Sequence, residues 1–224
     1  MSSLVDYKKF MLIQENITNF FPEKEEQNLK RLENNKSPKK NNVNIQSNHT
    51  DSLFWCFYII LNGEHDYEVN HSFQREKEFK IQSIEKLRNI KPQLKALKLK
   101  INETEDELLN SKNISIKGLI ALSLLYKKNI FYVWDRKYYE FISDAEQPIY
   151  IIYKKDNTYS HYIDDKKYVF FTENYWCIQN IDKPLKSITS YTRDELLDIC
   201  KKLEIQMSSK ETKKSLYEKI LEKL

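Results

Sequence analysis

The stretch "TDSLFWCFYII", residues 50–60, decides the fold because a polar start runs directly into eight apolar or aromatic residues. A helix that is apolar nearly all round belongs in the interior of a domain. The polar residues at positions 50–52 can supply an N-cap, and Gly63 can supply a left-handed C-terminal cap. The sequence therefore predicts a buried helix over residues 51–62, with Cys56 inside it.

The pattern of the chain changes downstream of this helix. Residues 71–126 interleave charged and apolar side chains at spacings of three and four, which predicts further helices, with Pro92 as a break. Residues 129–180 are rich in aromatic and β-branched side chains separated by short turns, including "KKYVFFTENYWCIQN" at 166–180. They predict an antiparallel meander of about five strands. Helices segregated from strands indicate an α+β fold with the helices packed on that sheet.

The remaining segments complete a four-part organisation. Apolar residues at near-helical spacing predict a helix within residues 1–29, and the polar, basic residues 30–47 predict a linker. Residues 48–185 form the core domain, and residues 186–224 form a small two-helix unit.

Composition limits the function. The chain has 224 residues, a formal charge of +4, and three widely spaced cysteines, which fit neither a disulfide framework nor a zinc site. An intracellular, reducing compartment is expected, because the start lacks a signal peptide. No apolar run is long enough for a membrane span, and no glycine-rich loop or metal cluster appears. We expect no membrane association, no cofactor and no metal.

Cys56 has two interpretations. It shares one helical face with Leu53, Phe57 and Ile60, which is typical of a small core residue. As a nucleophile it would need a base within hydrogen-bond reach, supplied from a distant part of the sequence. His161, in the strand-like "YSHYID", is the strongest of the four histidines for that role, and a structural His161 is the alternative.

A buried helix with a cysteine, followed far downstream by a strand with a histidine, resembles the papain-like cysteine peptidases. "SHYI" at 160–163 is similar to the His motif of ubiquitin-specific proteases, and "NYWCIQN" at 174–180 to the cathepsin strand that ends in the orienting Asn. "DSLFWCFYI" is similar to the Cys helix of uncharacterised papain-like proteins of large cytoplasmic DNA viruses. The resemblance covers residues 46–180 and implies a papain-like core.

The resemblance assigns roles to individual residues. It makes Cys56 the nucleophile and His161 the general base. Three candidates for the residue that orients the imidazole stay open: Asn174, Asn180 and Glu173. The cathepsin-like string selects the second, and a hairpin that places Phe170 opposite His161 selects the other two.

The residues before the cysteine depart from the family pattern. Papain-like enzymes carry an Asn or Gln there, whose side chain donates a hydrogen bond to the oxyanion. This chain has Asp51, whose ionised carboxylate cannot donate. Asn48 and Gln46 are the remaining candidates for the oxyanion donor.

The C-terminal string "YTRDELLDICKKLEIQMSSKETKKSLYEKILEKL", residues 191–224, resembles the SAP motif, a helix–loop–helix module that binds DNA. Thr192 and Glu195 form a capping-box signature at the start of its first helix. The resemblance implies DNA contacts from three lysines near the start of the second helix: Lys210, Lys213 and Lys214. The alternative is a two-helix cap packed on the sheet.

Together these patterns predict a thiol protease tethered to DNA, acting in the cytoplasm or virion of a large DNA virus. Its partners would be a protein substrate, such as a ubiquitin-like tail in deubiquitinase-like hydrolysis of an isopeptide bond, and DNA through residues 186–224. The alternative is a catalytically inactive papain-like, DNA-associated virion or scaffold protein. A weaker third hypothesis is a scaffold that binds partner proteins through the N-terminal helix.

Overall fold

A computed structural model describes residues 43–46, 51–156, 158–208 and 211–224 of the chain. These residues lie within one compact unit, Asn41–Leu224. The predicted N-terminal helix and most of the predicted linker lie outside the described residues. None of the helices in the described ranges is both long and apolar enough to cross a membrane.

The predicted buried helix is confirmed as α3, Ser52–Asn62. Asp51 is its N-cap, and its side chain accepts a hydrogen bond from the Phe54 N–H. Gly63 ends the helix with a φ of 88°, and its N–H donates to the Ile59 carbonyl at 2.8 Å. Every residue from Ser52 to Ile60 is buried, as an apolar helix in a core should be.

The helical region that follows has five parts: α4 (Glu64–Asn70), α5 (Phe73–Asn89), α6 (Lys91–Ala96), α7 (Ile101–Asn110) and α8 (Ile116–Tyr126). Pro92 lies in the first turn of α6, where its missing N–H costs no helical hydrogen bond. The predicted break between the first two long helices at Pro92 is therefore confirmed. Ser72 and Ser115 cap the N-termini of α5 and α8.

The strands form one six-stranded sheet in the order β1-β5-β4-β2-β3-β6. Their bounds are β1 (Val43–Gln46), β2 (Asn129–Trp134), β3 (Lys137–Phe141), β4 (Ile149–Lys155), β5 (Thr158–Tyr162) and β6 (Trp176–Cys177). The α+β class is as predicted, but the expectation of an antiparallel meander is wrong. β4 returns to the far side of β2 and pairs with it in parallel, and β6 is parallel to β3. β1 lies within the stretch predicted as a linker.

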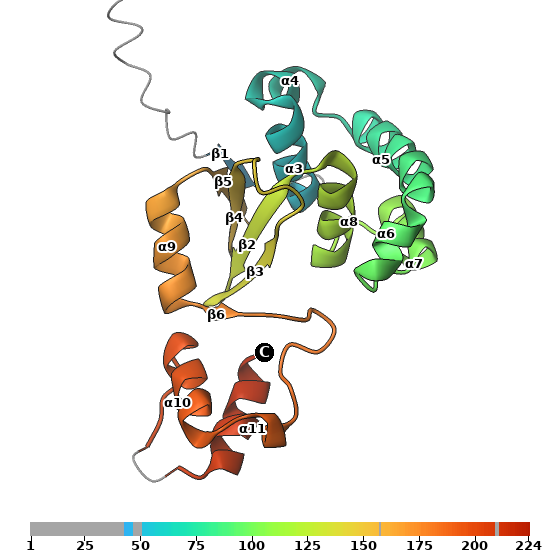
Figure 1. Ribbon diagram of the computed structural model, residues 1–224. Helices are drawn as coiled ribbons and strands as arrows, with labels where there is room; N and C mark the ends of the chain where they lie inside the picture. Colours follow the sequence, from blue (N-terminus) through green and yellow to red (C-terminus); the bar gives the residue numbers. More distant parts are fainter. Residues whose placement is uncertain (1–42, 47–50, 157, 209–210) are drawn as a thin grey trace, which may run out of the picture. The chain divides into compact units, whose positions relative to one another are not determined.

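The two faces of the sheet are covered by different helices (Figure 1). Ile130, Tyr132 and Ile152 pack in the core cluster that contains α3 and α8. Phe131 and Ile151, their neighbours along the strands, pack in a second cluster with residues of α9. Alternation along each strand therefore builds a core on both sides of the sheet.

The segment predicted as the last strand is the helix α9 (Asp165–Asn174). The Asp164 carboxylate accepts hydrogen bonds from the N–H groups of Lys166 and Lys167, which starts a helix where a hairpin turn was expected. Aromatic residues of α9 and its C-cap, spaced by three and four, pack on the sheet: Tyr168, Phe171 and Tyr175. That helical spacing outweighs the strand propensity of the single residues.

The C-terminal pair consists of α10 (Arg193–Lys202) and α11 (Lys213–Lys223), preceded by a short 3-10 turn at Ile188–Ser190. The predicted capping box is confirmed, since Thr192 and Glu195 bond reciprocally. Apolar residues of the pair share one cluster with three residues of the preceding segment: Leu196, Cys200, Leu203, Leu216 and Ile220 with Trp176, Ile178 and Leu185.

Two cations of the β2–β3 hairpin bind the C-terminal ends of both helices. Arg136 Nε donates to the carbonyl of Lys202, the last residue of α10, at 3.2 Å. Lys137 Nζ donates to the carbonyls of Lys223 and Leu224 at the end of α11, at 3.5 Å each. Helix C-termini carry partial negative charge, so these contacts dock both helices on the sheet.

Candidate functional site

Cys56 is the fifth residue of α3 and has no exposed surface. Burial raises the pKa of its thiol, and within the described ranges no charged or hydrogen-bonded partner opposes that shift. The stabilising field at a helix N-terminus fades within the first turn, and Cys56 lies beyond that turn. A protonated, unreactive thiol is the expected state of such a cysteine.

His161 faces the same core as Cys56. In β5 it lies directly opposite Ile152 of β4 and Val43 of β1. Ile152 packs in the cluster that contains Cys56, and side chains opposite each other on paired strands share a face. This register corrects the prediction that a hairpin places Phe170 opposite His161, because Phe170 lies in the helix α9.

The structure does not show Cys56 and His161 as a hydrogen-bonded pair. No hydrogen bond joins Cys56 to His161 among the described residues, and the buried Nδ1 of His161 has no partner. Burial alone lowers the pKa of the imidazole, which is 9% exposed. A base that activates a thiol needs hydrogen-bond contact with it, and the structure lacks that contact.

None of the three residues proposed to orient the imidazole forms a hydrogen bond with it. Glu173 is exposed near the end of α9. The Asn174 amide donates to the Phe170 carbonyl at 2.8 Å, one helical turn back. The side-chain Oδ1 of Asn180 accepts from the backbone N–H groups of Asp182 and Lys183. Both asparagines therefore stabilise their own local backbone.

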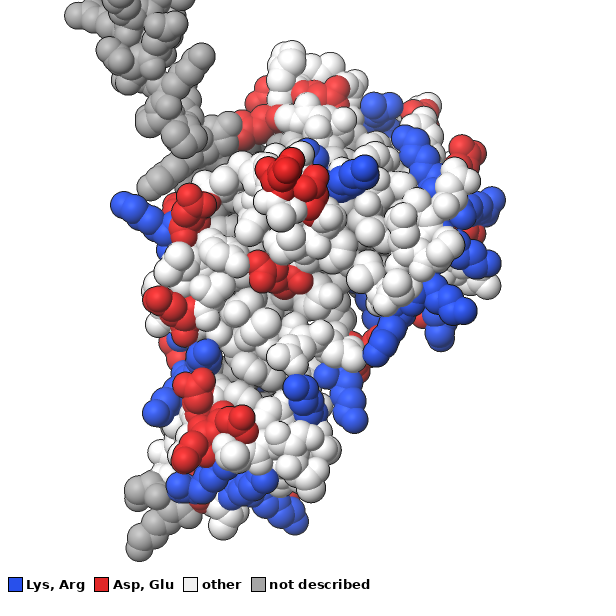
Figure 2. Space-filling model, in the orientation of Figure 1, with Lys and Arg blue, Asp and Glu red and all other residues white. Residues whose placement is uncertain are grey.

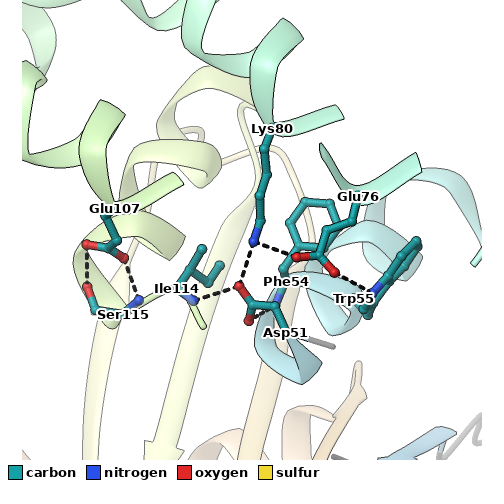
Figure 3. Close-up of polar contacts among 8 residues, drawn as sticks. All are labelled: Asp51, Phe54, Trp55, Glu76, Lys80, Glu107, Ile114 and Ser115. Carbon is teal, nitrogen blue, oxygen red and sulfur yellow. Dashed lines mark hydrogen bonds and ion pairs between the residues drawn. The ribbon is translucent and has the colours of Figure 1, made fainter. Parts of the chain in front are cut away.

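Asp51 has a structural role in place of an oxyanion donor. Its carboxylate is fully buried and accepts hydrogen bonds from the backbone N–H groups of Phe54 and Ile114, at 3.1 and 2.6 Å. Lys80 Nζ lies 3.0 Å from the same carboxylate (Figure 3). Of the two other candidates for the oxyanion donor, Gln46 pairs through its backbone with Thr158, and Asn48 lies outside the described residues.

The network around Asp51 continues through α5. Lys80 Nζ also donates to Glu76 at 2.8 Å, and the other oxygen of that carboxylate accepts from the Trp55 Nε1–H at 3.0 Å (Figure 3). Sequence reasoning missed this network. Its only signal was the i, i+4 spacing of Glu76 and Lys80 on a helix, which is common on exposed surfaces.

The other two cysteines offer no alternative nucleophile paired with a histidine. Cys177 lies in β6 and is exposed, and burial of its sulfur still raises its pKa. Cys200 is buried in the cluster of the C-terminal pair. Among the described residues, no three His, Cys, Asp or Glu side chains gather as a metal ion would require.

The N-terminus of α11 is unusually basic. Lys213 and Lys214 are its first two residues, and no acidic residue lies in that turn. Cations are unfavourable at the positive end of a helix dipole, and α10 follows the usual preference with Asp194 and Glu195. Lys210, the third lysine of the predicted DNA site, lies outside the described residues.

Basic side chains are unevenly spread over the face seen in Figure 2. They gather along the helical edge made by α5 to α7, whereas basic and acidic side chains lie side by side on α10 and α11. The C-terminal pair therefore presents local basic points such as Lys213 and Lys214, without a broad basic surface in this view.

No protein family, curated protein or solved structure matches this chain.

Proposed function

We propose that this chain binds nucleic acid through its C-terminal helical pair, and that its α+β core is a scaffold and not an active peptidase. The proposal that the core is a scaffold rests on the complete burial of Cys56, without a hydrogen bond to His161. A thiol in that environment does not ionise readily, and thiolate attack is the first step of cysteine peptidase chemistry.

The N-terminus of α11 supports the binding half of the proposal. Its free N–H groups and the ammonium groups of Lys213 and Lys214 suit phosphate oxygens, which proteins bind without reading base sequence. Both helices are docked at their C-terminal ends by Arg136 and Lys137. An 11-residue helix spans about 16 Å, so the first turn of α11 lies far from its docked end.

Fluorescence anisotropy with a labelled 20-base-pair duplex of arbitrary sequence tests this proposal. We expect the double variant K213Q/K214Q to bind more weakly, with the slope of log K against log salt reduced by about 1.8. The matched control K112Q/K166Q removes two exposed lysines of the core and should leave binding unchanged. Equal affinities for the two variants would refute the proposal.

A second candidate function is a cysteine peptidase, favoured by one observation. The Nδ1 of His161 is buried, has no hydrogen-bond partner in the part of the chain that the structure describes, and belongs to a side chain on the face of the sheet that packs against α3. Buried polar atoms nearly always have a partner, so this nitrogen is suited to a second arrangement of the site. In that arrangement Cys56 Sγ would attack an amide carbonyl carbon while His161 takes the thiol proton.

His161 would then pass that proton to the leaving amine, and water would hydrolyse the thioester. The test is a ubiquitin-tail probe with a C-terminal electrophile, applied to the wild type and to Cys56→Ala and Cys177→Ala. Labelling that is lost only in Cys56→Ala would establish the peptidase and overturn the scaffold proposal. Absence of Cys56 labelling would reject the peptidase.

A further inference from the structure

A cleft of about 610 Å³ lies between the helical layer and the sheet, close to the start of α3. Its walls come from the α6–α7 connection, from α7, from the start of α8, and from strands β2, β4 and β5. Ligand pockets of proteins commonly enclose about 300–1,000 Å³. Neither Cys56 nor His161 lines this cleft, so it is separate from the candidate catalytic pair.

Three aromatic rings line the sheet side of the cleft: Tyr132, Trp134 and Tyr159. The ring centres of Tyr132 and Trp134 lie 5.0 Å apart, and those of Tyr132 and Tyr159 lie 6.5 Å apart. Tyr132 is buried, whereas Trp134 and Tyr159 are half-buried and keep ring surface open. The result is a row of rings from β2 and β5, which lie on either side of β4.

Two lysines bring uncompensated charge to this row. Lys154 of β4 lies directly opposite Tyr159, and side chains in that relation share a face of the sheet. Lys98 lines the opposite wall, in the connection before α7. Neither lysine forms an ion pair with another residue in the ranges that the structure describes.

The other two lysines at the cleft are already paired with carboxylates. Lys117 bonds Asp182, and Lys100 lies 2.7 Å from Glu103. The Glu107 carboxylate accepts from the backbone N–H and the hydroxyl of Ser115 (Figure 3). Ser115 is neutral, so Glu107 keeps its negative charge, and Lys98 and Lys154 together leave the cleft with a small net positive charge.

We propose that this cleft binds single-stranded nucleic acid, with a base stacked on Trp134 or Tyr159 and phosphates beside Lys98 and Lys154. Single strands are commonly held by aromatic platforms next to lysines that follow the backbone. An acidic peptide would use the lysines but would leave the rings without a planar partner. A duplex keeps its bases paired and cannot offer one to the rings. The site is independent of the C-terminal pair, which we propose contacts phosphates alone.

The test compares three labelled ligands on the full chain by fluorescence anisotropy: a ten-nucleotide oligothymidylate, an abasic ten-mer with the same phosphates, and a ten-residue polyglutamate peptide. We expect the oligothymidylate to bind about tenfold more tightly than the abasic strand, because stacking is lost without bases. The peptide should bind no better than the abasic strand.

Lysine variants then test whether this cleft is the binding site. K98Q/K154Q should weaken oligothymidylate binding about tenfold and reduce its salt slope by about 1.4. K112Q/K166Q should have no such effect, and K213Q/K214Q should keep the preference for the oligothymidylate over the abasic strand. The inference is overturned if the abasic strand or the peptide binds as well as the oligothymidylate. It is also overturned if K98Q/K154Q binds like the wild type.

Discussion

Asp51 Oδ2 and Lys80 Nζ lie 3.0 Å apart, and their side chains are 0% and 4% exposed. The contact joins the N-cap of α3 to the middle of α5. The same carboxylate also accepts the Ile114 N–H, just before α8. Three segments that are distant in sequence therefore meet at one buried charge pair.

Replacing Lys80 by Met should lower the free energy of unfolding by about 3–5 kcal/mol, because the carboxylates of Asp51 and Glu76 would stay buried without their cation. Urea unfolding followed by circular dichroism measures the change. Arg88→Gln breaks the exposed ion pair with Glu105 and is the control, with a much smaller expected effect. Similar losses for both variants would contradict a special role of the buried pair.

Iodoacetamide should distinguish the three cysteines of the folded protein. Cys177 is exposed, so it should be alkylated first, whereas Cys56 and Cys200 are buried and should react only when the structure opens. Peptide mapping by mass spectrometry, in buffer and in 6 M guanidinium chloride, measures the labelling of each site. Rapid labelling of Cys56 in buffer would be inconsistent with its burial.

Mild acid should destabilise the fold through His161. Burial lowers the pKa of this imidazole below its usual value of 6.5, so below that pH the unfolded chain binds a proton that the folded chain resists. The free energy of unfolding should therefore fall as the pH drops below about 6.5, by at most about 1.4 kcal/mol per pH unit from this residue.

Urea unfolding of His161→Gln at pH 7 and pH 5.5 tests the assignment. The variant should show a flatter pH dependence than the wild type, while His71→Gln, which changes an exposed histidine, should follow the wild type. A wild-type pH dependence in His161→Gln would show that other groups cause the acid sensitivity.

Arg136→Met should loosen the attachment of α10 to the sheet. Arg136 donates to the Lys202 carbonyl, lies 3.1 Å from Glu204, and stacks 4.4 Å from the ring centre of Tyr175. We expect a loss of about 1–2 kcal/mol of stability, and faster hydrogen exchange at the end of α10. Glu204→Gln keeps the carbonyl contact and should change both quantities less.

Capping residues and apolar spacing predicted the helices whose start and end signals lie close together in sequence. The apolar run at residues 53–60, with polar residues at 50–52 before it and Gly63 after it, predicted α3 and the places where it begins and ends. Thr192 and Glu195 predicted the start of α10 in the same way. In both cases the side chain and the backbone group that it satisfies lie within a few residues of each other.

The errors arose where long-range pairing decides the outcome. The parallel pairing of β4 with β2 depends on which edge of a hairpin a later strand joins, and side-chain patterns do not encode that choice. The region of α9 was predicted as a strand from its aromatic residues, although Asp164 carried a helix start signal. That error also misplaced Glu173 and Asn174 beside His161.

The site could be predicted only in part. The resemblance implied that Cys56 and His161 would pair, and it left open whether the helix face that bears Cys56 brings the sulfur into contact with the imidazole. That contact depends on the axial position of α3 over β5, which is fixed by the packing of its large side chains. Asp51 looked like an impaired oxyanion donor, whereas its bonding partners Lys80 and Ile114 come from segments with no local signal.

The docking of both C-terminal helices on Arg136 and Lys137 has a practical consequence for dissecting this protein. Burial already lowers the pKa of Lys137, and its acceptors are the last carbonyls of α11. A chain shortened to residue 185 would lose those acceptors and uncover Trp176, Ile178 and Leu185. The shortest form that folds well should therefore extend through α11, so the role of the helical pair is better tested by side-chain replacement than by truncation.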